Sequence, residues 1–162
     1  EQLSRGDVKG AEKPLSELAA SSHEGYRVGA RFLQADVALQ KNDLKAAARI
    51  FGEVASDSGV SPAFRNLALI RQTSAEFDTL KPETVIARLK PLAVKDGPWL
   101  GSAGELVAAA YLQINQPQQA ANLFAMIAED DKLPETLRTR AAQMAGTLGV
   151  DAIKDSGDKK PQ

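Results

Sequence analysis

Residues 42–51 read NDLKAAARIF, and residues 115–124 read NQPQQAANLF. Each stretch begins with a polar turn and leads into a helical pattern in which an alanine and a phenylalanine lie four positions apart. Residues that are four apart lie on the same face of an α-helix. The two stretches therefore predict helices that pack through one small and one large apolar side chain.

This spacing of a small and a large apolar residue occurs four times. The pairs are Ala11 with Leu15, Ala47 with Phe51, Val85 with Leu89, and Ala120 with Phe124. Their first members are 36, 38 and 35 residues apart. A period in the mid-thirties is typical of helix-turn-helix repeats of the tetratricopeptide type, which stack into solenoids. We therefore predict an all-α, tetratricopeptide-like helical-hairpin solenoid, which offers a shaped surface and not a reactive pocket.

The composition is ordinary for a soluble globular domain, with 162 residues that are 43% hydrophobic and 25% charged. The formal net charge is −1 and no basic cluster stands out, so we expect no nucleic-acid partner. No apolar run approaches the roughly 20 residues that cross a bilayer. The absence of cysteine excludes disulfides and thiolate chemistry, and it fits either a reducing cytoplasm or an oxidising envelope.

Apolar periodicity and turn signals predict about eight helices, which form three hairpins with a half repeat at each end. They cover about 7–20, 24–42, 44–56, 62–80, 82–92, 99–114, 117–127 and 134–148. Pro91 falls inside one of them and should kink or shorten it. We expect one repeat domain over 1–150 and a flexible tail over 151–162. Only six residues precede the first predicted helix, too few to form its partner, so we expect the chain to have been cut inside a longer first helix.

The sequence offers little material for catalysis or metal binding. His23 is the only histidine and lacks the second histidine of a helical zinc motif, so we interpret it as a loop residue. The acidic run 129–131 lacks the alternating ligands of a calcium loop, so a solvated turn is preferred. The segment 101–104 (GSAG) lacks the spacing of a nucleophile elbow, and its small residues favour close helix packing. We therefore expect no enzymatic activity, no metal and no cofactor.

The best candidate for a binding surface is the concave face, which the first helix of each hairpin lines in such solenoids. Periodicity places a mixture of apolar, acidic and hydroxyl side chains there, namely Phe32, Asp36, Leu39, Ile70, Ser74, Phe77, Glu105 and Leu112. Trp99, the sole tryptophan, is added as a candidate anchor. Such a face suits a peptide or a partner helix. The alternative is that Phe32, Ile70 and Phe77 belong to the core and Trp99 is a structural plug.

Several stretches between Val60 and Gly149 form a distinctive combination, namely SPAFRNLA (61–68), ARLKPLA (87–93), GPW (97–99), SAGE (102–105) and LRTRA (137–141). This combination resembles a bacterial family of membrane-anchored tetratricopeptide-like proteins related to the ancillary subunit of the Sec translocon. The similarity extends more weakly back to Gly6. It implies an N-terminal transmembrane helix, missing from this sequence, followed by a helical domain on the periplasmic side of the inner membrane. It also implies contacts with translocon subunits and periplasmic chaperones, and it implies no catalytic residues.

Two functions follow as hypotheses. The first is a periplasmic protein–protein interaction domain of an inner-membrane-anchored protein, which assists the Sec translocon and periplasmic chaperones with exported proteins. The second is a structural scaffold or oligomerisation module in envelope assembly or cell division. Self-association through an exposed helix face would favour the second, whereas a monomer that binds translocon and chaperone subunits would favour the first.

Overall fold

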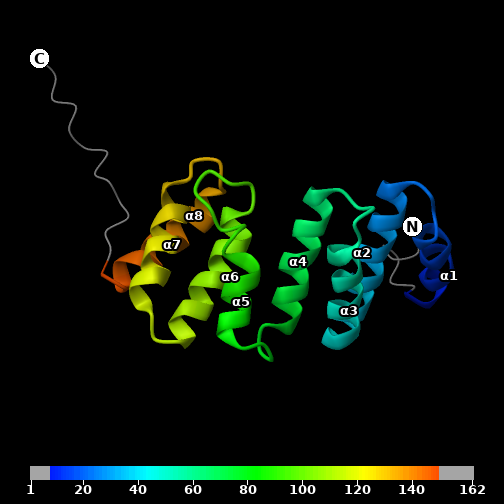
Figure 1. Cartoon of the computed structure of the whole chain (residues 1–162), viewed down its shortest axis with the longest axis horizontal. Helices are drawn as coiled ribbons and strands as arrows, with labels where there is room; N and C mark the ends of the chain where they lie inside the picture. The colour runs from blue at the N-terminus through cyan, green and yellow to red at the C-terminus, as the bar shows by residue number, and fades with distance from the viewer. Residues whose placement is uncertain (1–7, 150–162) are drawn as a thin grey trace, which may run out of the picture. The chain divides into compact units, whose positions relative to one another are not determined.

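The computed structural model describes residues 8–149, which form helices and the turns between them (Figure 1). The helices in this range are α1 (Val8–Ala19), α2 (Glu24–Gln40), α3 (Leu44–Ser56), α4 (Pro62–Glu76), α5 (Pro82–Leu89), α6 (Leu100–Gln113), α7 (Pro117–Glu129) and α8 (Glu135–Thr147). No strand occurs between residues 8 and 149. The prediction of an all-α chain with about eight helices is therefore confirmed. The tail expected over 151–162 lies outside the described residues.

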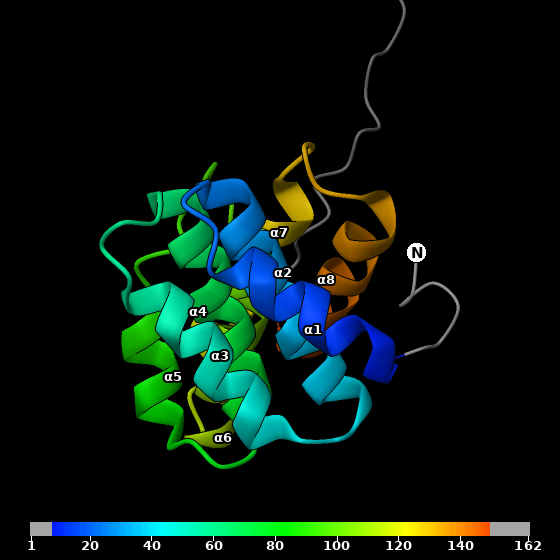
Figure 2. The same cartoon turned by 90° about the vertical axis from the view of Figure 1, so that its right-hand side faces the viewer.

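The helices divide into two compact units, Glu1–Leu80 and Lys81–Gln162. In the first unit α1 packs on α2, α2 on α3 and α3 on α4, and α2 and α3 lie side by side in both views (Figure 1 and Figure 2). In the second unit α5 packs on α6, α6 on α7 and α7 on α8. Within each unit, each helix thus packs on its neighbours in sequence, which is typical of helical hairpins. The single repeat domain expected over 1–150 stays a prediction.

The two units contain the same hairpin turn. α3 and α7 are both 13 residues long and begin 73 positions apart (44 to 117). The turns before them place Asn42 at φ 57° and Asn115 at φ 56°, in the left-handed region that asparagine tolerates. The next N–H groups, of Asp43 and Gln116, donate to carbonyls five residues earlier, at 2.8 and 2.9 Å. This hydrogen bond closes the preceding helix as a Schellman motif in both units.

The turns that follow α3 and α7 also match. The Asp57 carboxylate accepts the Gly59 N–H at 2.8 Å, and the Asp130 carboxylate accepts the Lys132 N–H at 3.0 Å. Asp57 and Asp130 are again 73 positions apart (57 to 130). Such Asx turns fix the direction in which the next helix begins. Because Asp130 is only 9% exposed, the expectation of a fully solvated acidic turn at 129–131 is wrong at this residue.

The core uses small residues beside a few large ones. All eight residues of the repeated spacing are buried: Ala11, Leu15, Ala47, Phe51, Val85, Leu89, Ala120 and Phe124. A Cβ on Gly101 would lie 3.0 Å from Leu137 Cδ2, and one on Gly104 would lie 3.1 Å from Ile127 Cδ1. The close helix packing predicted for 101–104 is therefore confirmed, since a larger residue would push α7 or α8 away.

A proline follows closely after the end of α5. α5 is only eight residues long and ends at Leu89, two residues before Pro91, so the helix expected over 82–92 is shortened, as the position of Pro91 predicted. Within residues 8–149, no helix combines the length and the apolar character that a membrane span requires.

Candidate functional site

The described residues bring no metal-binding cluster together. Between residues 8 and 149, no group of three or more His, Cys, Asp and Glu side chains is placed to hold a metal ion. His23 is exposed and precedes α2, as expected for a loop residue, and its ring lies edge-on to Tyr26 with 5.9 Å between centroids. The remaining candidate residues lie on the helices and at their ends.

An aromatic cluster joins α2, α3 and α4. The Phe32 ring on α2 lies 5.8 Å from the Phe51 ring on α3 and 6.4 Å from the Phe64 ring on α4. Phe51 is fully buried, Phe32 is half-buried, and Phe64 is 37% exposed. The cluster therefore runs from the core to the surface, where Phe64 and Phe32 offer an aromatic contact area.

An ion pair lies beside these rings and links the same helices. The Asp36 carboxylate on α2 pairs with the Arg71 guanidinium on α4. The Arg71 guanidinium also lies 4.7 Å from the centroid of the Phe51 ring, which is the geometry of a cation–π contact. Both charged side chains are a little over one-third exposed, so the pair contributes only about 0.2–1 kcal/mol to stability. We call Phe32, Asp36, Phe64 and Arg71 the α2–α4 face.

The other candidates of the first unit differ in accessibility. Leu39 is half-buried and packs against the cluster around Phe51, and Phe77 is half-buried just after α4. Ser74 is exposed on α4. Ile70 is only 5% exposed, so it belongs to the core, as the alternative interpretation held, and we withdraw it as a binding residue.

Three candidates lie in the second unit. Trp99 is half-buried at the N-cap of α6, where its carbonyl accepts the Ala103 N–H at 2.8 Å. Glu105 on α6 accepts a hydrogen bond from Arg140 Nε on α8 at 3.1 Å and forms an ion pair with the same guanidinium. Leu112 is half-buried near the end of α6. Glu105 thus links α6 to α8 through the Arg140 guanidinium.

A glutamate ties the start of α2 to the start of α4. The Glu24 carboxylate accepts the Ser61 N–H at 2.7 Å. This backbone hydrogen bond, helped by the Ser61 hydroxyl, lowers the pKa of Glu24 below its ordinary value of 4.5. The contact stabilises the charged carboxylate and holds two neighbouring helices of the first unit together at one end.

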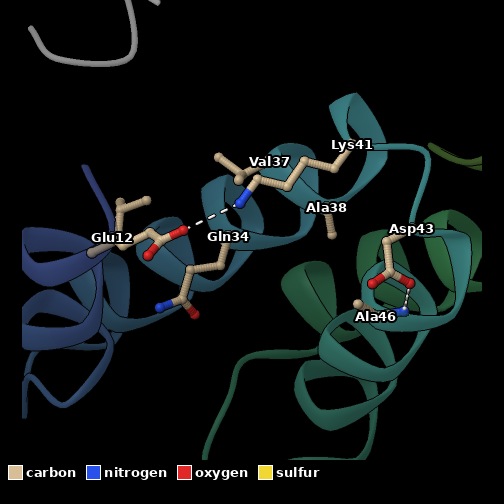
Figure 3. Close-up of a pocket in the computed structure, with 8 residues that line it drawn as sticks. Glu12, Gln34, Val37, Ala38, Lys41, Asp43 and Ala46 are labelled. Atoms are coloured by element: carbon tan, nitrogen blue, oxygen red, sulfur yellow. Dashed lines mark hydrogen bonds and ion pairs between the residues drawn. The ribbon is translucent and has the colours of Figure 1, made fainter. Parts of the chain in front are cut away.

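A hollow that the sequence pattern does not predict lies between α1, α2 and α3 and has a volume of about 410 Å³ (Figure 3). Figure 3 shows the Lys41 side chain reaching from α2 to Glu12 on α1, where their charged groups lie 3.1 Å apart. Asp43 turns inward to accept the Ala46 N–H at 2.9 Å, which caps α3. Periodicity points to the first helix of each expected hairpin, whereas α1 and α3 fall at positions expected for second helices.

A second hollow of about 500 Å³ adjoins the first along the same three helices, since Gln34 lines both. The Glu53 carboxylate on its wall is shared by Arg31, at 2.8 Å, and by Arg49. The i, i+4 spacing of Arg49 and Glu53 was visible in the sequence, but the partner on α2 was not.

In comparisons with known proteins, no family model, no curated protein and no solved structure matches this chain.

Proposed function

We propose that the chain is a protein-interaction domain made of tetratricopeptide-like helical hairpins, without a catalytic step of its own. The repeated spacing supports this proposal, because the hairpin and its turns return after 73 positions (44 to 117), close to two periods of a mid-thirties repeat. The packing of each helix on its sequence neighbours within each unit supports it as well.

The observation that carries the proposal is the accessible aromatic pair on the α2–α4 face. Phe64 is 37% exposed although its ring packs on Phe32, so a partner side chain could extend the cluster outward. Aromatic residues are enriched among those that contribute most to binding at protein interfaces. The ion pair of Asp36 and Arg71 beside the rings adds polar groups that could orient a peptide or a helix.

The location and partners in this proposal rest on the sequence resemblance. The domain would lie on the periplasmic side of the bacterial inner membrane, tethered through an N-terminal anchor. There it would assist the Sec translocon and periplasmic chaperones with exported proteins. The membrane would be contacted only through that anchor.

Photo-crosslinking in membranes tests the proposal. The full-length protein would carry benzoyl-phenylalanine in place of Phe64, and a control would carry it in place of Val94, which is 50% exposed and lies between α5 and α6. We expect crosslinks from position 64 to translocon subunits, chaperones or exported proteins, and few from position 94. The absence of such crosslinks at position 64 would overturn the proposal. Crosslinks from position 64 to a second copy of the chain alone would also overturn it, in favour of a scaffold.

A further inference from the structure

The two adjoining hollows form one groove that runs along α2 between α1 and α3. Gln34 on the floor lines both hollows, whose volumes are about 410 and 500 Å³. On the α3 wall the lining runs from Asp43 to Glu53. That stretch of helix is about 15 Å long at about 1.5 Å per residue. We call it the α1–α3 groove, and it is long enough for a short peptide segment.

The middle of the α1–α3 groove is aliphatic. Leu15 from α1, Val37 and Ala38 from α2, and Ala46 and Ile50 from α3 line it. Ala46 and Ile50 are half-buried, so apolar surface remains accessible there. Covering such surface with aliphatic side chains removes it from water and favours binding.

The two ends of the groove carry opposite charge. At one end the lining carries the carboxylates of Glu12 and Asp43 and a single ammonium, that of Lys41, which pairs with Glu12. At the other end Arg31 and Arg49 share the one carboxylate of Glu53.

At the arginine end, Arg31 and Arg49 have N–H donors that do not bind Glu53. A guanidinium has five N–H donors, and Arg31 and Arg49 each use only Nη1 to reach Glu53. Arginine binds carboxylates through paired hydrogen bonds, so this end of the groove suits a further carboxylate.

We infer that the α1–α3 groove binds a short peptide segment that is aliphatic in its middle and carries a carboxylate at the end that meets Arg31 and Arg49. The opposite charges at the two ends set the direction in which the segment lies, since its carboxylate is attracted to Arg31 and Arg49 and repelled by the carboxylates of Glu12 and Asp43. The inference rests on the proposed protein-binding role and adds a second surface to it, separate from the α2–α4 face.

An NMR titration of the isotopically labelled chain tests the inference. The probe is an acetylated hexapeptide amide that alternates leucine and alanine and ends in glutamate, and its control has glutamine in place of the glutamate. We expect the amide signals of Gln34, Ala46 and Ile50 to shift, and the control peptide to bind about fivefold to tenfold more weakly. Arg49→Glu should weaken binding of the acidic peptide by a similar factor, whereas Lys13→Glu, on an exposed α1 residue outside the groove lining, should not.

The inference would be overturned if the acidic peptide caused no amide shifts, or if the shifts were confined to Phe32 and Phe64. It would also be overturned if the glutamine control peptide bound as tightly as the acidic peptide, or if Arg49→Glu did not weaken binding of the acidic peptide. The amide spectrum of each variant reports whether the chain is folded. If the titration gives no shifts but position 64 still crosslinks to partners, peptide binding in the α1–α3 groove is overturned and the proposed protein-binding role is not.

Discussion

The left-handed residue that begins the α2–α3 turn allows a sharp test of the hairpin geometry. Asn42 is exposed and has φ 57°, so its substitution changes the backbone preference with little effect on packing. An alanine in the left-handed region costs roughly 1–2 kcal/mol, whereas glycine has no such penalty. Glycine in turn lowers the free energy of unfolding by about 0.4–1 kcal/mol relative to alanine, because it gives the unfolded chain more conformational freedom. We therefore expect Asn42→Gly to be more stable than Asn42→Ala by about 0.5–1.5 kcal/mol.

Urea denaturation followed by circular dichroism measures this difference. With a denaturant slope of about 2 kcal/mol per molar urea, the midpoint of the alanine variant should be lower by roughly 0.3–0.8 M. The same pair of variants at Asn115, where φ is 56°, should give a difference of the same sign. Ser74, exposed inside α4, is the control, because there alanine should be the more stable variant by about 1 kcal/mol. An alanine variant at position 42 as stable as the glycine variant would refute the left-handed turn.

Three further perturbations have expected outcomes. Phe51→Ala should lower the free energy of unfolding by about 3–5 kcal/mol in urea denaturation, because the side chain is fully buried. Gly101→Ala should lower the thermal midpoint, since its Cβ would lie 3.0 Å from Leu137, whereas Gly29→Ala, with nothing within 4 Å of its Cβ, should raise it. The lowered pKa of Glu24 means that its contribution to stability is present above the unfolded-state value near 4.5 and is lost as pH falls through the folded-state pKa. Glu24→Gln should therefore reduce the loss of stability on acidification, as measured by urea midpoints at about pH 7 and about pH 3; an unchanged pH dependence would contradict the contact with the Ser61 N–H.

The helices could be predicted from the sequence because their signals are local. The Asp43 cap and the Ala47–Phe51 spacing predict a helix over 44–56, and α3 has those bounds. Pro62 and Pro117 likewise mark the first residues of α4 and α7. These signals act within one or two helical turns, so they do not depend on how the helices pack.

The surfaces could not be predicted in the same way, because they depend on which helices meet. Leu18 follows the buried Leu15 by three positions, a spacing that predicts the same helix face, yet Leu18 is 44% exposed. Asp36 was predicted as a binding residue, but no local pattern pointed to Arg71, 35 positions along the chain, as its partner. The α1–α3 groove is lined by three helices whose order in space periodicity does not give. Periodicity thus identifies one face of a helix but not the neighbour that covers it.

Binding through the α2–α4 face is the central claim, and co-isolation of partners from bacterial membranes with matched surface variants tests it most directly. Phe64→Asp places a charge beside Phe32, whereas Val94→Asp places the same charge at an exposed site between α5 and α6. Both variants should keep the helical circular dichroism spectrum. The proposed function predicts that Phe64→Asp lowers the recovery of translocon and chaperone subunits at least about fivefold, while Val94→Asp leaves it unchanged. Equal recovery with the two variants would contradict binding through this face.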